Sequence, residues 1–286
     1  MVQVPMVSIV IVSWNSREYL ARCLRSIQHW VTYDHEIIVV DNASGDGSPD
    51  FVARSFPKVR LIRNDQNFSF AHASNQGMRV ATGRFVVLLN PDTELIEEPF
   101  QSMIATSQAD QSIACVGPEL VNEDRSHQPS VRHFPRLADQ TVILLKLRPL
   151  LQWLPLMKRY MTEPPPGTGP TDVEQIMGAV MLIPRAALEA IGLFDELYPN
   201  WFEEVDWCTR ARQAGWRVVY DRGTKIVHTG GTSFRQVLTI KKQRWLLTGL
   251  RRYAAKNWSK KDRLVLSGVI PVSIILSYIQ LVIKPR

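Results

Sequence analysis

Cysteine is scarce in this sequence, and the few residues present exclude a disulfide framework. Cys23, Cys115 and Cys208 lie far apart in a chain of 286 residues and form no CxxC pair. Scattered cysteines in odd number do not fit a small secreted protein stabilised by cross-links, so we expect a reducing compartment.

The N-terminus lacks the basic segment that opens a secretory signal peptide. Its first residues, MVQVPMVSIVIVSWN, pass directly into an apolar run rich in β-branched side chains. We therefore interpret this run as a buried first strand and not as a targeting segment.

Acidic residues are nearly absent from the last fifty positions. Residues 237–286 contain eleven Lys and Arg and a single acid, Asp262, while the whole chain has a net charge of +7. The rest of the chain is therefore slightly negative, which argues against a basic nucleic-acid-binding face, and no nucleic acid is expected as a partner. Because the basic segment is also apolar, it favours contact with a membrane surface that contains anionic lipids.

Short apolar runs alternate with helix-spaced segments along most of the chain. Such near-continuous apolar strands are typical of a parallel sheet that is covered on both faces. The predicted fold class is α/β, with a mostly parallel central sheet flanked by helices and with ligands beyond the carboxyl ends of the strands. Strands are predicted at residues 7–13, 36–40, 59–63, 85–89, 113–117, 174–183, 216–222 and 225–228, and helices at 17–30, 70–82, 185–192 and 204–215.

Three segments depart from this alternation. Residues 142–161 mix apolar and basic side chains with two prolines, and we interpret them as an insertion that is either a core helical hairpin or membrane-facing. Residues 244–258 have the pattern of a basic interfacial helix, and residues 264–283 contain no charge over a length that could span a bilayer. Spanning or deep insertion is favoured for the last segment over an interfacial or core helix. The apolar stripe of the interfacial helix consists of Leu246, Leu247, Leu250, Tyr253 and Ala254.

Polar side chains follow the first two predicted strands. Ser13 and Asn15 close the first, and Asp41 closes the second, where it opens the segment DNASGDGSPD. A carboxylate at such a strand end can accept a hydrogen bond from a ring N–H of a nucleobase. Turn formation is the competing interpretation, because Asp, Asn, Ser and Gly all favour turns.

Two further strand ends carry possible metal ligands. Asn90 and Asp92 follow the strand at 85–89, and His228 ends the last strand before two glycines. Hard divalent cations bind one or two carboxylates together with substrate phosphate oxygens, and histidine is a common metal ligand. Turn chemistry at Asp92 and a structural histidine are the alternatives.

Carboxylates are crowded by aromatic residues in the segment NWFEEVDWCTRARQAGW. Asp206 and Arg210 are four residues apart on the predicted helix and should form an ion pair. Glu203 and Glu204 lie at the helix start, where the dipole favours negative charge. That preference does not explain the neighbouring aromatics, whereas an apolar cleft would raise a carboxylate pKa and make the group a better base.

Together these stretches resemble the inverting glycosyltransferases of family 2, which have the GT-A fold, and in particular their bacterial rhamnosyltransferase-like branch. The similarity covers about residues 7–234 and includes VSIVIVSWN, IIVVDNASGDGS, FAHASNQGMRVATG, FVVLLNPD, GAVMLIPRAALEAIGLFDE, FEEVDWCTRAR and VHTGGTS. The resemblance implies a catalytic domain at 1–236, with a nucleotide-binding half to about 120 and an acceptor half that contains an insertion at 140–170. The segment 237–286 would then form basic and hydrophobic helices.

The same resemblance implies a donor site and a cofactor. Asp41 would contact the nucleobase and Asn75 would lie near the sugar diphosphate, with Ser13 and Asn15 also in the donor site. Asp92 stands at the end of the family's metal-binding motif, whose first acid is replaced here by Asn90. Mg²⁺ or Mn²⁺ is therefore the expected cofactor.

The resemblance further implies catalytic and acceptor residues. His228 would join the metal site, and Gly178 would lie at the acceptor pocket. Glu204 would be the base, although relatives commonly have Asp at this position, with Glu203 or Asp206 as alternatives. The reaction would be one direct displacement that inverts the anomeric centre, without a carboxylate nucleophile.

The expected substrates follow from the same branch of the family. The donor would be a dTDP- or UDP-linked sugar, with rhamnose as the first candidate, and the acceptor a glycan or polyprenyl-diphosphate-linked sugar in cell-surface polysaccharide biosynthesis. The protein would lie at the cytoplasmic face of the inner (plasma) membrane, peripheral or anchored by its C-terminal segment. The alternatives are a sugar nucleotidyltransferase, disfavoured because SWNSREYL lacks a glycine-rich loop, and a catalytically silent nucleotide-sugar-binding membrane scaffold.

Overall fold

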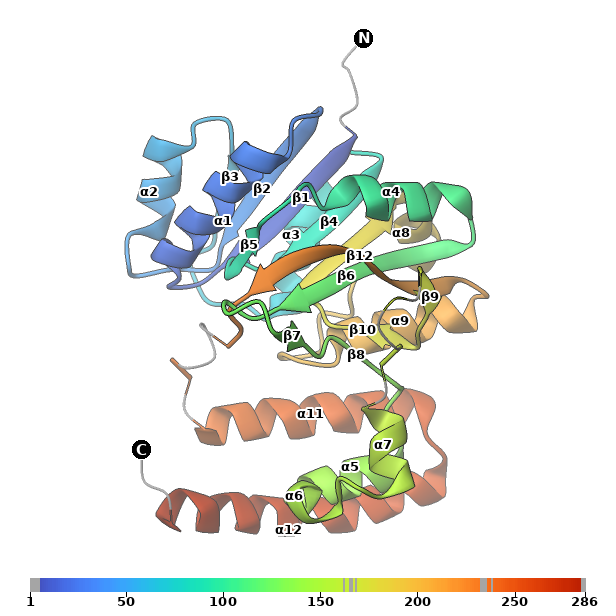
Figure 1. Ribbon diagram of the computed structural model, residues 1–286. Coiled ribbons are helices and arrows are strands. Elements are labelled where there is room, and N and C mark those ends of the chain that lie inside the picture. The colour runs from blue at the N-terminus through green and yellow to red at the C-terminus, as the bar shows by residue number, and fades with distance from the viewer. Residues whose placement is uncertain are drawn as a thin grey trace.

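A mixed sheet covered by helices on both faces forms the body of the protein (Figure 1). The computed structural model describes residues 6–161, 163, 164, 167, 169–231, 236, 237 and 239–283, without the side chains of 280–283. Within these ranges the main sheet has ten strands, eight of them in the order β3-β2-β1-β4-β11-β6-β12-β5. The strands are β1 (Val7–Ser13), β2 (His35–Asp41), β3 (Arg60–Arg63), β4 (Phe85–Leu89), β5 (Thr93–Leu95), β6 (Ile113–Val121), β7 (His127–Gln128), β8 (Val131–Arg132), β9 (Thr171–Asp172), β10 (Gln175–Ile176), β11 (Val180–Pro184) and β12 (Arg217–His228).

The predicted parallel arrangement is confirmed for strands β3, β2, β1 and β4. Ser13 pairs with Asp41 across β1 and β2, so the polar residues that follow these strands emerge at one edge of the sheet. Strand β11 lies antiparallel between β4 and β6, which the sequence pattern did not reveal. The sheet is nevertheless mostly parallel, as expected.

Two hydrophobic clusters, one on each face of the sheet, form the core. Helices α1, α2 and α4 cover one face, and α3, α8 and α9 cover the other. Side chains of β1 alternate between these clusters, because successive residues of a strand point to opposite faces. The helices are α1 (Arg17–Trp30), α2 (Ser48–Ser55), α3 (Phe70–Val80), α4 (Phe100–Ala109), α5 (Leu137–Leu144), α6 (Arg148–Leu151), α7 (Pro155–Tyr160), α8 (Arg185–Ile191), α9 (Glu203–Gln213), α11 (Thr239–Asn257) and α12 (Lys260–Ile283).

Two predicted strands differ in the structure. The segment predicted as one strand at 174–183 is divided into β10 and β11, with residues 177–179 between them. Strand β10 pairs with β8 in a separate two-stranded sheet, so the chain changes sheets at this point. Conversely, the segments 216–222 and 225–228 form the single strand β12, whose register shifts between Asp221 and Lys225.

Helices α11 and α12 lie together as a layer beyond α9, at the bottom of Figure 1. A third hydrophobic cluster joins α11 to the start of α9, where Phe202 packs on Tyr253 with ring centroids 5.9 Å apart. The stripe predicted to face a membrane is therefore largely buried inside the protein, and the interfacial interpretation of this helix is wrong. Arg252 and Lys256, two of the basic residues of this helix, form ion pairs with Asp195 at 2.6 and 2.7 Å.

The predicted insertion contains the end of α5 and the short helices α6 and α7, and it is not a helical hairpin. Helix α5 packs against α12, whereas Leu150 of α6 and Trp153 in the turn after it are exposed. In the described part of the chain, one helix is long and apolar enough to cross a membrane, over Lys260–Ile279. One side of this helix packs on α11 and α5, where Leu266, Ile270 and Ser273 are buried.

Candidate active site

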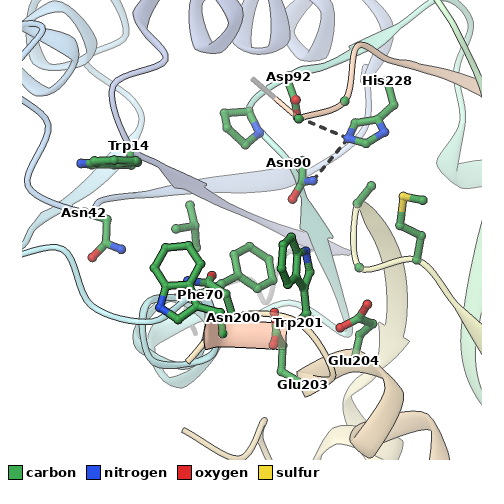
Figure 2. A pocket seen from close by; sticks show the side chains of 18 of the residues that line it. Trp14, Asn42, Phe70, Asn90, Asp92, Asn200, Trp201, Glu203, Glu204 and His228 are labelled. Atoms are coloured by element: carbon green, nitrogen blue, oxygen red, sulfur yellow. Dashed lines mark hydrogen bonds and ion pairs between the residues drawn. The ribbon is translucent and has the colours of Figure 1, made fainter. Parts of the chain in front are cut away.

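A cavity of about 420 Å³ lies beyond the carboxyl ends of the parallel strands (Figure 2). This volume is within the range of small-molecule sites, about 300–1,000 Å³. Loops after β1, β2 and β4 meet the start of α9 and the end of β12 around it. The lining residues are Val12, Trp14, Asn42, Asn67, Phe68, Phe70, Asn90, Pro91, Asp92, Gln128, Arg132, Met177, Gly178, Ala179, Asn200, Trp201, Glu203, Glu204, His228, Gly230, Gly231, Val237 and Trp245.

Asp92 and His228 face each other on one side of this cavity. Their Oδ1 and Nε2 atoms are 3.4 Å apart, and both side chains are buried. The His228 Nδ1 atom lies 2.7 Å from Oε1 of Gln128, which can only accept, so Nδ1 carries the proton. This leaves the Nε2 lone pair directed toward Asp92 and Asn90, the orientation that a metal-binding histidine needs.

These donors fit a divalent cation of the expected kind. A carboxylate oxygen and an imidazole nitrogen that are buried close together suit Mn²⁺, and the carboxylate suits Mg²⁺. In the described ranges, no three His, Cys, Asp or Glu side chains converge as a ready-made metal cage. A cation held here would therefore need further ligands, such as phosphate oxygens and water.

Glu203 and Glu204 reach the cavity from a strained turn at the start of α9. The two preceding residues, Trp201 and Phe202, have φ angles of 65° and 72°, in the left-handed region that bulky side chains rarely adopt. Such strain persists only where the surrounding packing holds it, and it is frequent at functional sites. A Cβ added at Gly249 of α11 would lie 3.1 Å from the Trp201 carbonyl oxygen, so α11 packs closely on this turn.

The two glutamates have different environments. Burial raises the pKa of Glu203 well above its usual value, and the neighbouring Glu204 adds to the shift. Glu203 is 4% exposed, and its Oε2 has no hydrogen-bond partner among the described residues. Burial also raises the pKa of the half-buried Glu204, while the positive charge of Arg132 acts in the opposite direction. These environments favour a proton on Glu203 and a negative charge on Glu204.

Gly178 lies directly beside Glu204. A Cβ at this glycine would be 3.5 Å from Cβ and 3.6 Å from Cγ of Glu204, which is van der Waals contact. The predicted acceptor-pocket glycine and the predicted base thus border the same space.

Asp206 is not among the residues that line the cavity. Its carboxylate accepts hydrogen bonds from Arg210 at 3.0 Å, from Lys256 at 2.7 Å and from the Tyr198 hydroxyl at 3.1 Å. The predicted ion pair with Arg210 is confirmed. These contacts make Asp206 an anchor between α9 and α11 and give it no access to a substrate in the cavity.

Ser13, Asn15 and Asp41 lie just behind the cavity wall, whereas their neighbours Trp14 and Asn42 line it. The Asn15 Oδ1 accepts the Gly45 N–H at 2.7 Å, which ties the loop after β1 to the loop after β2. Ser13 is buried with its Oγ 3.0 Å from that of Ser16. Asp41 accepts the Ser44 N–H through Oδ2, and its buried Oδ1 has no hydrogen-bond partner in the part of the chain described.

Asn75, predicted to lie near the sugar diphosphate, is not among the residues that line the cavity. Its Nδ2 donates to the Phe194 carbonyl at 2.9 Å and to Glu196 at 2.8 Å, and its Oδ1 accepts the Phe194 N–H at 3.0 Å. The side chain therefore fixes α3 to the segment between α8 and α9.

Several cavity residues escaped the sequence interpretation. Gln128 and Arg132 lie in two-residue strands too short to produce a periodic pattern, and Trp245 lies in the segment interpreted as membrane-facing. Phe68 and Phe70 flank the start of α3. The clustering of aromatics near 68–70 was an available signal for these two, whereas the others required the tertiary structure.

The comparison with protein families decides the identity of this fold and site. The model described as "Glycosyl transferase family 2" matches residues 8–170, more than half of the chain. The chain belongs to this family. The motif-based prediction is thus confirmed, and membership favours a glycosyl transfer enzyme over the sugar nucleotidyltransferase alternative.

This family 2 member is similar in sequence to a named rhamnosyltransferase. It is 25% identical over 233 residues to the N-acetylglucosaminyl-diphospho-decaprenol L-rhamnosyltransferase of Mycobacterium tuberculosis, covering 77% of this chain and 75% of the relative. The rhamnosyltransferase-like character expected from the motifs is in agreement with this match.

Solved structures confirm the GT-A fold of the chain. It superimposes on a mannosyltransferase from Pyrobaculum calidifontis in complex with GDP-Man and Mn²⁺ with a TM-score of 0.57 and 17% identity, over all of this chain and 77% of that one. It also superimposes on GalNAc-T7 with UDP, GalNAc and Mn²⁺ with a TM-score of 0.59 and 18% identity. That match covers 79% of this chain but only 43% of GalNAc-T7.

Proposed function

We propose that this family 2 member transfers a sugar from a nucleoside-diphosphate sugar to a hydroxyl of a polyprenyl-diphosphate-linked acceptor, with inversion of the anomeric centre. The observation that carries the proposal is the meeting of Asp92, His228 and Glu204 around one cavity, although they are remote in sequence. A cation-binding pair on one wall and a carboxylate on another are what a single displacement requires.

Asp92 and His228 would hold Mg²⁺ or Mn²⁺. When bound, the cation would neutralise negative charge that develops on the nucleoside diphosphate as it leaves. The orphan Oδ1 of Asp41 supports a role in donor binding, because a ring N–H of uracil or thymine would satisfy this buried acceptor. Trp14 and Asn42, which reach the cavity from the same two loops, would complete the nucleotide side of the site.

Glu204 would accept the proton of the attacking hydroxyl. Its carboxylate is half-buried at the cavity beside Gly178, and a raised pKa brings its basicity closer to that of a base working near neutral pH. Glu203, the more deeply buried of the pair, would retain a proton and so keep a second negative charge away from Glu204. The turn at Trp201 and Phe202 would fix both side chains in place.

The substrates are proposed from the named relative. The name of the M. tuberculosis relative states that its acceptor is linked to diphospho-decaprenol and that the transferred sugar is rhamnose. We therefore propose dTDP- or UDP-linked rhamnose as the first donor to test and a polyprenyl-diphosphate-linked sugar as the acceptor.

A lipid acceptor requires access to a membrane, which the exposed apolar side of α12 would provide. Ile275 is 58% exposed on this side, and Leu150 and Trp153 of the insertion are 69% and 64% exposed. Exposed Arg148 and Lys260 add positive charge, which complements anionic lipids at the cytoplasmic face of a membrane. Because the other side of α12 packs on α11 and α5, a peripheral position along the membrane surface accounts for both sides.

Membrane binding can be tested with vesicles that contain anionic lipid. Ile275→Glu and Trp153→Glu should each weaken sedimentation with these vesicles about tenfold, since each removes an apolar side chain from the contact and adds a repelled charge. Gln111→Glu, which adds the same charge at the exposed turn before β6, should bind like the unaltered protein. Equal binding by all four proteins would contradict this membrane contact.

Turnover separates the proposed enzyme from a silent nucleotide-sugar binder. Full-length protein, Mn²⁺ and a series of dTDP- and UDP-sugars are incubated with a short-chain polyprenyl-diphosphate-linked sugar, and released nucleoside diphosphate and extended acceptor are measured. We expect stoichiometric release and extension with one donor and the opposite anomeric configuration in the product. Donor binding without release under any of these conditions would favour the silent binder.

A further inference from the structure

Arg132 is a cavity residue for which the proposed reaction has assigned no task. It ends strand β8 opposite Gln175 of β10, is half-buried, and lines the cavity. In the ranges that the structure describes, its guanidinium makes no hydrogen bond or ion pair with another side chain. An arginine at a cavity wall without a fixed carboxylate partner is suited to binding an anionic ligand.

Arg132 lies close to the helix that carries the proposed base, because β8 pairs with β10 and β10 packs against α9. The charge of Arg132 lowers the pKa of Glu204 and also opposes the burial-induced rise in the pKa of Tyr160, so it acts on both groups. Tyr160 is the last residue of α7, in the insertion whose helix α5 packs against α12. His133, the residue after Arg132, donates its backbone N–H to the Tyr160 carbonyl at 3.2 Å. Arg132 therefore lies between the helix that carries the proposed base and the helices that would contact the membrane.

We infer that Arg132 binds the diphosphate of the lipid-linked acceptor. This inference rests on the proposed function, in which the acceptor sugar presents its hydroxyl to Glu204 while its lipid extends toward α12. The diphosphate joins that sugar to the lipid, so it must lie between the two, where Arg132 is found. Guanidinium groups bind phosphate oxygens through two parallel N–H donors, a geometry that a single ammonium group cannot match.

The alternative ligand for Arg132 is the diphosphate of the donor. That group must leave toward the Asp92–His228 pair, which occupies another wall of the cavity from Glu204 in Figure 2. Arg132, in contrast, lies on the β8–β10 strand pair, which packs against the helix that carries Glu204. The acceptor diphosphate is therefore the better match.

Two acceptors test the assignment, with all proteins assayed at full length. One is a sugar joined to a farnesyl chain through a diphosphate, and the other is the same sugar joined to the same chain through an ether oxygen. The unaltered protein should prefer the diphosphate acceptor, and Arg132→Gln should reduce kcat/KM for it about 10- to 100-fold, mainly through KM. For the ether acceptor the loss should be several times smaller, and Arg132→Lys should recover part of the preference.

Controls distinguish this role from two others. Arg125→Gln, a substitution of an exposed arginine in the turn before β7, should leave the preference intact. An equal loss for both acceptors with a shifted pH profile would mean that Arg132 acts only on Glu204, and weaker binding of the nucleoside diphosphate would assign it to the donor. Either result overturns the inference, as does an unaltered protein that uses both acceptors equally. Failure of the proposed function itself would differ, because no donor would then release nucleoside diphosphate.

Discussion

Replacing Glu204 with Gln should reduce kcat about 1,000-fold, because general-base catalysis contributes about 10²- to 10⁴-fold. Glutamine keeps the size of the side chain beside Gly178 but cannot take a proton from the acceptor hydroxyl. Donor binding should be nearly unchanged, since the nucleotide would be held at the loops after β1, β2 and β4. Initial rates of sugar transfer and calorimetric titration with the nucleotide measure the two effects separately.

Glu203→Gln is the matched control for this substitution. Its carboxylate is the more deeply buried and is favoured to carry the shared proton, so a neutral amide should perturb the site far less. We expect a reduction in kcat below about tenfold, well under the loss expected for removal of a general base. Full activity of Glu204→Gln together with an inactive Glu203→Gln would exchange the proposed roles of the two residues.

Asp92→Asn should reduce transfer about 100- to 1,000-fold, because a catalytic cation supplies several kcal/mol of charge stabilisation and each 1.4 kcal/mol is a factor of ten in rate. The amide is isosteric but neutral, and it would hold a divalent cation more weakly beside His228. Binding of Mn²⁺ in the presence of nucleoside diphosphate, followed by electron paramagnetic resonance, should weaken in parallel.

Glu94 offers the appropriate control for this second substitution. It lies two positions further along the chain, is partly exposed, and pairs with Arg22 at 2.7 Å, outside the cavity. Glu94→Gln removes the same charge two residues away, in β5, yet an exposed ion pair contributes only about 0–1 kcal/mol. If the Asp92→Asn variant were as active as the Glu94→Gln variant and responded equally to Mn²⁺, Asp92 would not be a ligand of the cation.

The sequence predicted correctly those helices and strands whose residue pattern and end signals lie within the element itself. The strand at 7–13 has the same bounds in the structure as β1, and the helix ending at Gly192 is α8, because a glycine in the left-handed region stops a helix. The prediction of a single strand at 174–183 was wrong because its first residues pair with β8, a partner that periodicity cannot reveal. The antiparallel place of β11 in the sheet is likewise a property of long-range pairing.

The candidate site likewise contains residues that local patterns identified and residues whose surroundings depend on long-range contacts. Asp92, Glu204 and His228 could be named from strand ends, a helix start and a family resemblance, and they do meet at the cavity. The contacts of Asn75 could not be predicted, because its partners, Phe194 and Glu196, are more than one hundred residues away along the chain. The interpretation of the apolar stripe on α11 as membrane-facing was wrong for a physical reason. An apolar face that covers a protein surface has the same pattern as one that covers a lipid surface.

The close packing of Gly249 against the Trp201–Phe202 turn links the tail of the chain to the turn that positions Glu203 and Glu204. Shortening the protein before α11 would uncover Phe202 and remove the partners of Asp195, so the left-handed turn would lose its support along with any lipid contact. If such a truncated protein were inactive, loss of the turn's support and loss of the lipid contact would be equally valid explanations. Single substitutions on the outer side of α12 leave the turn supported, and for that reason they are the cleaner way to separate membrane attachment from chemistry.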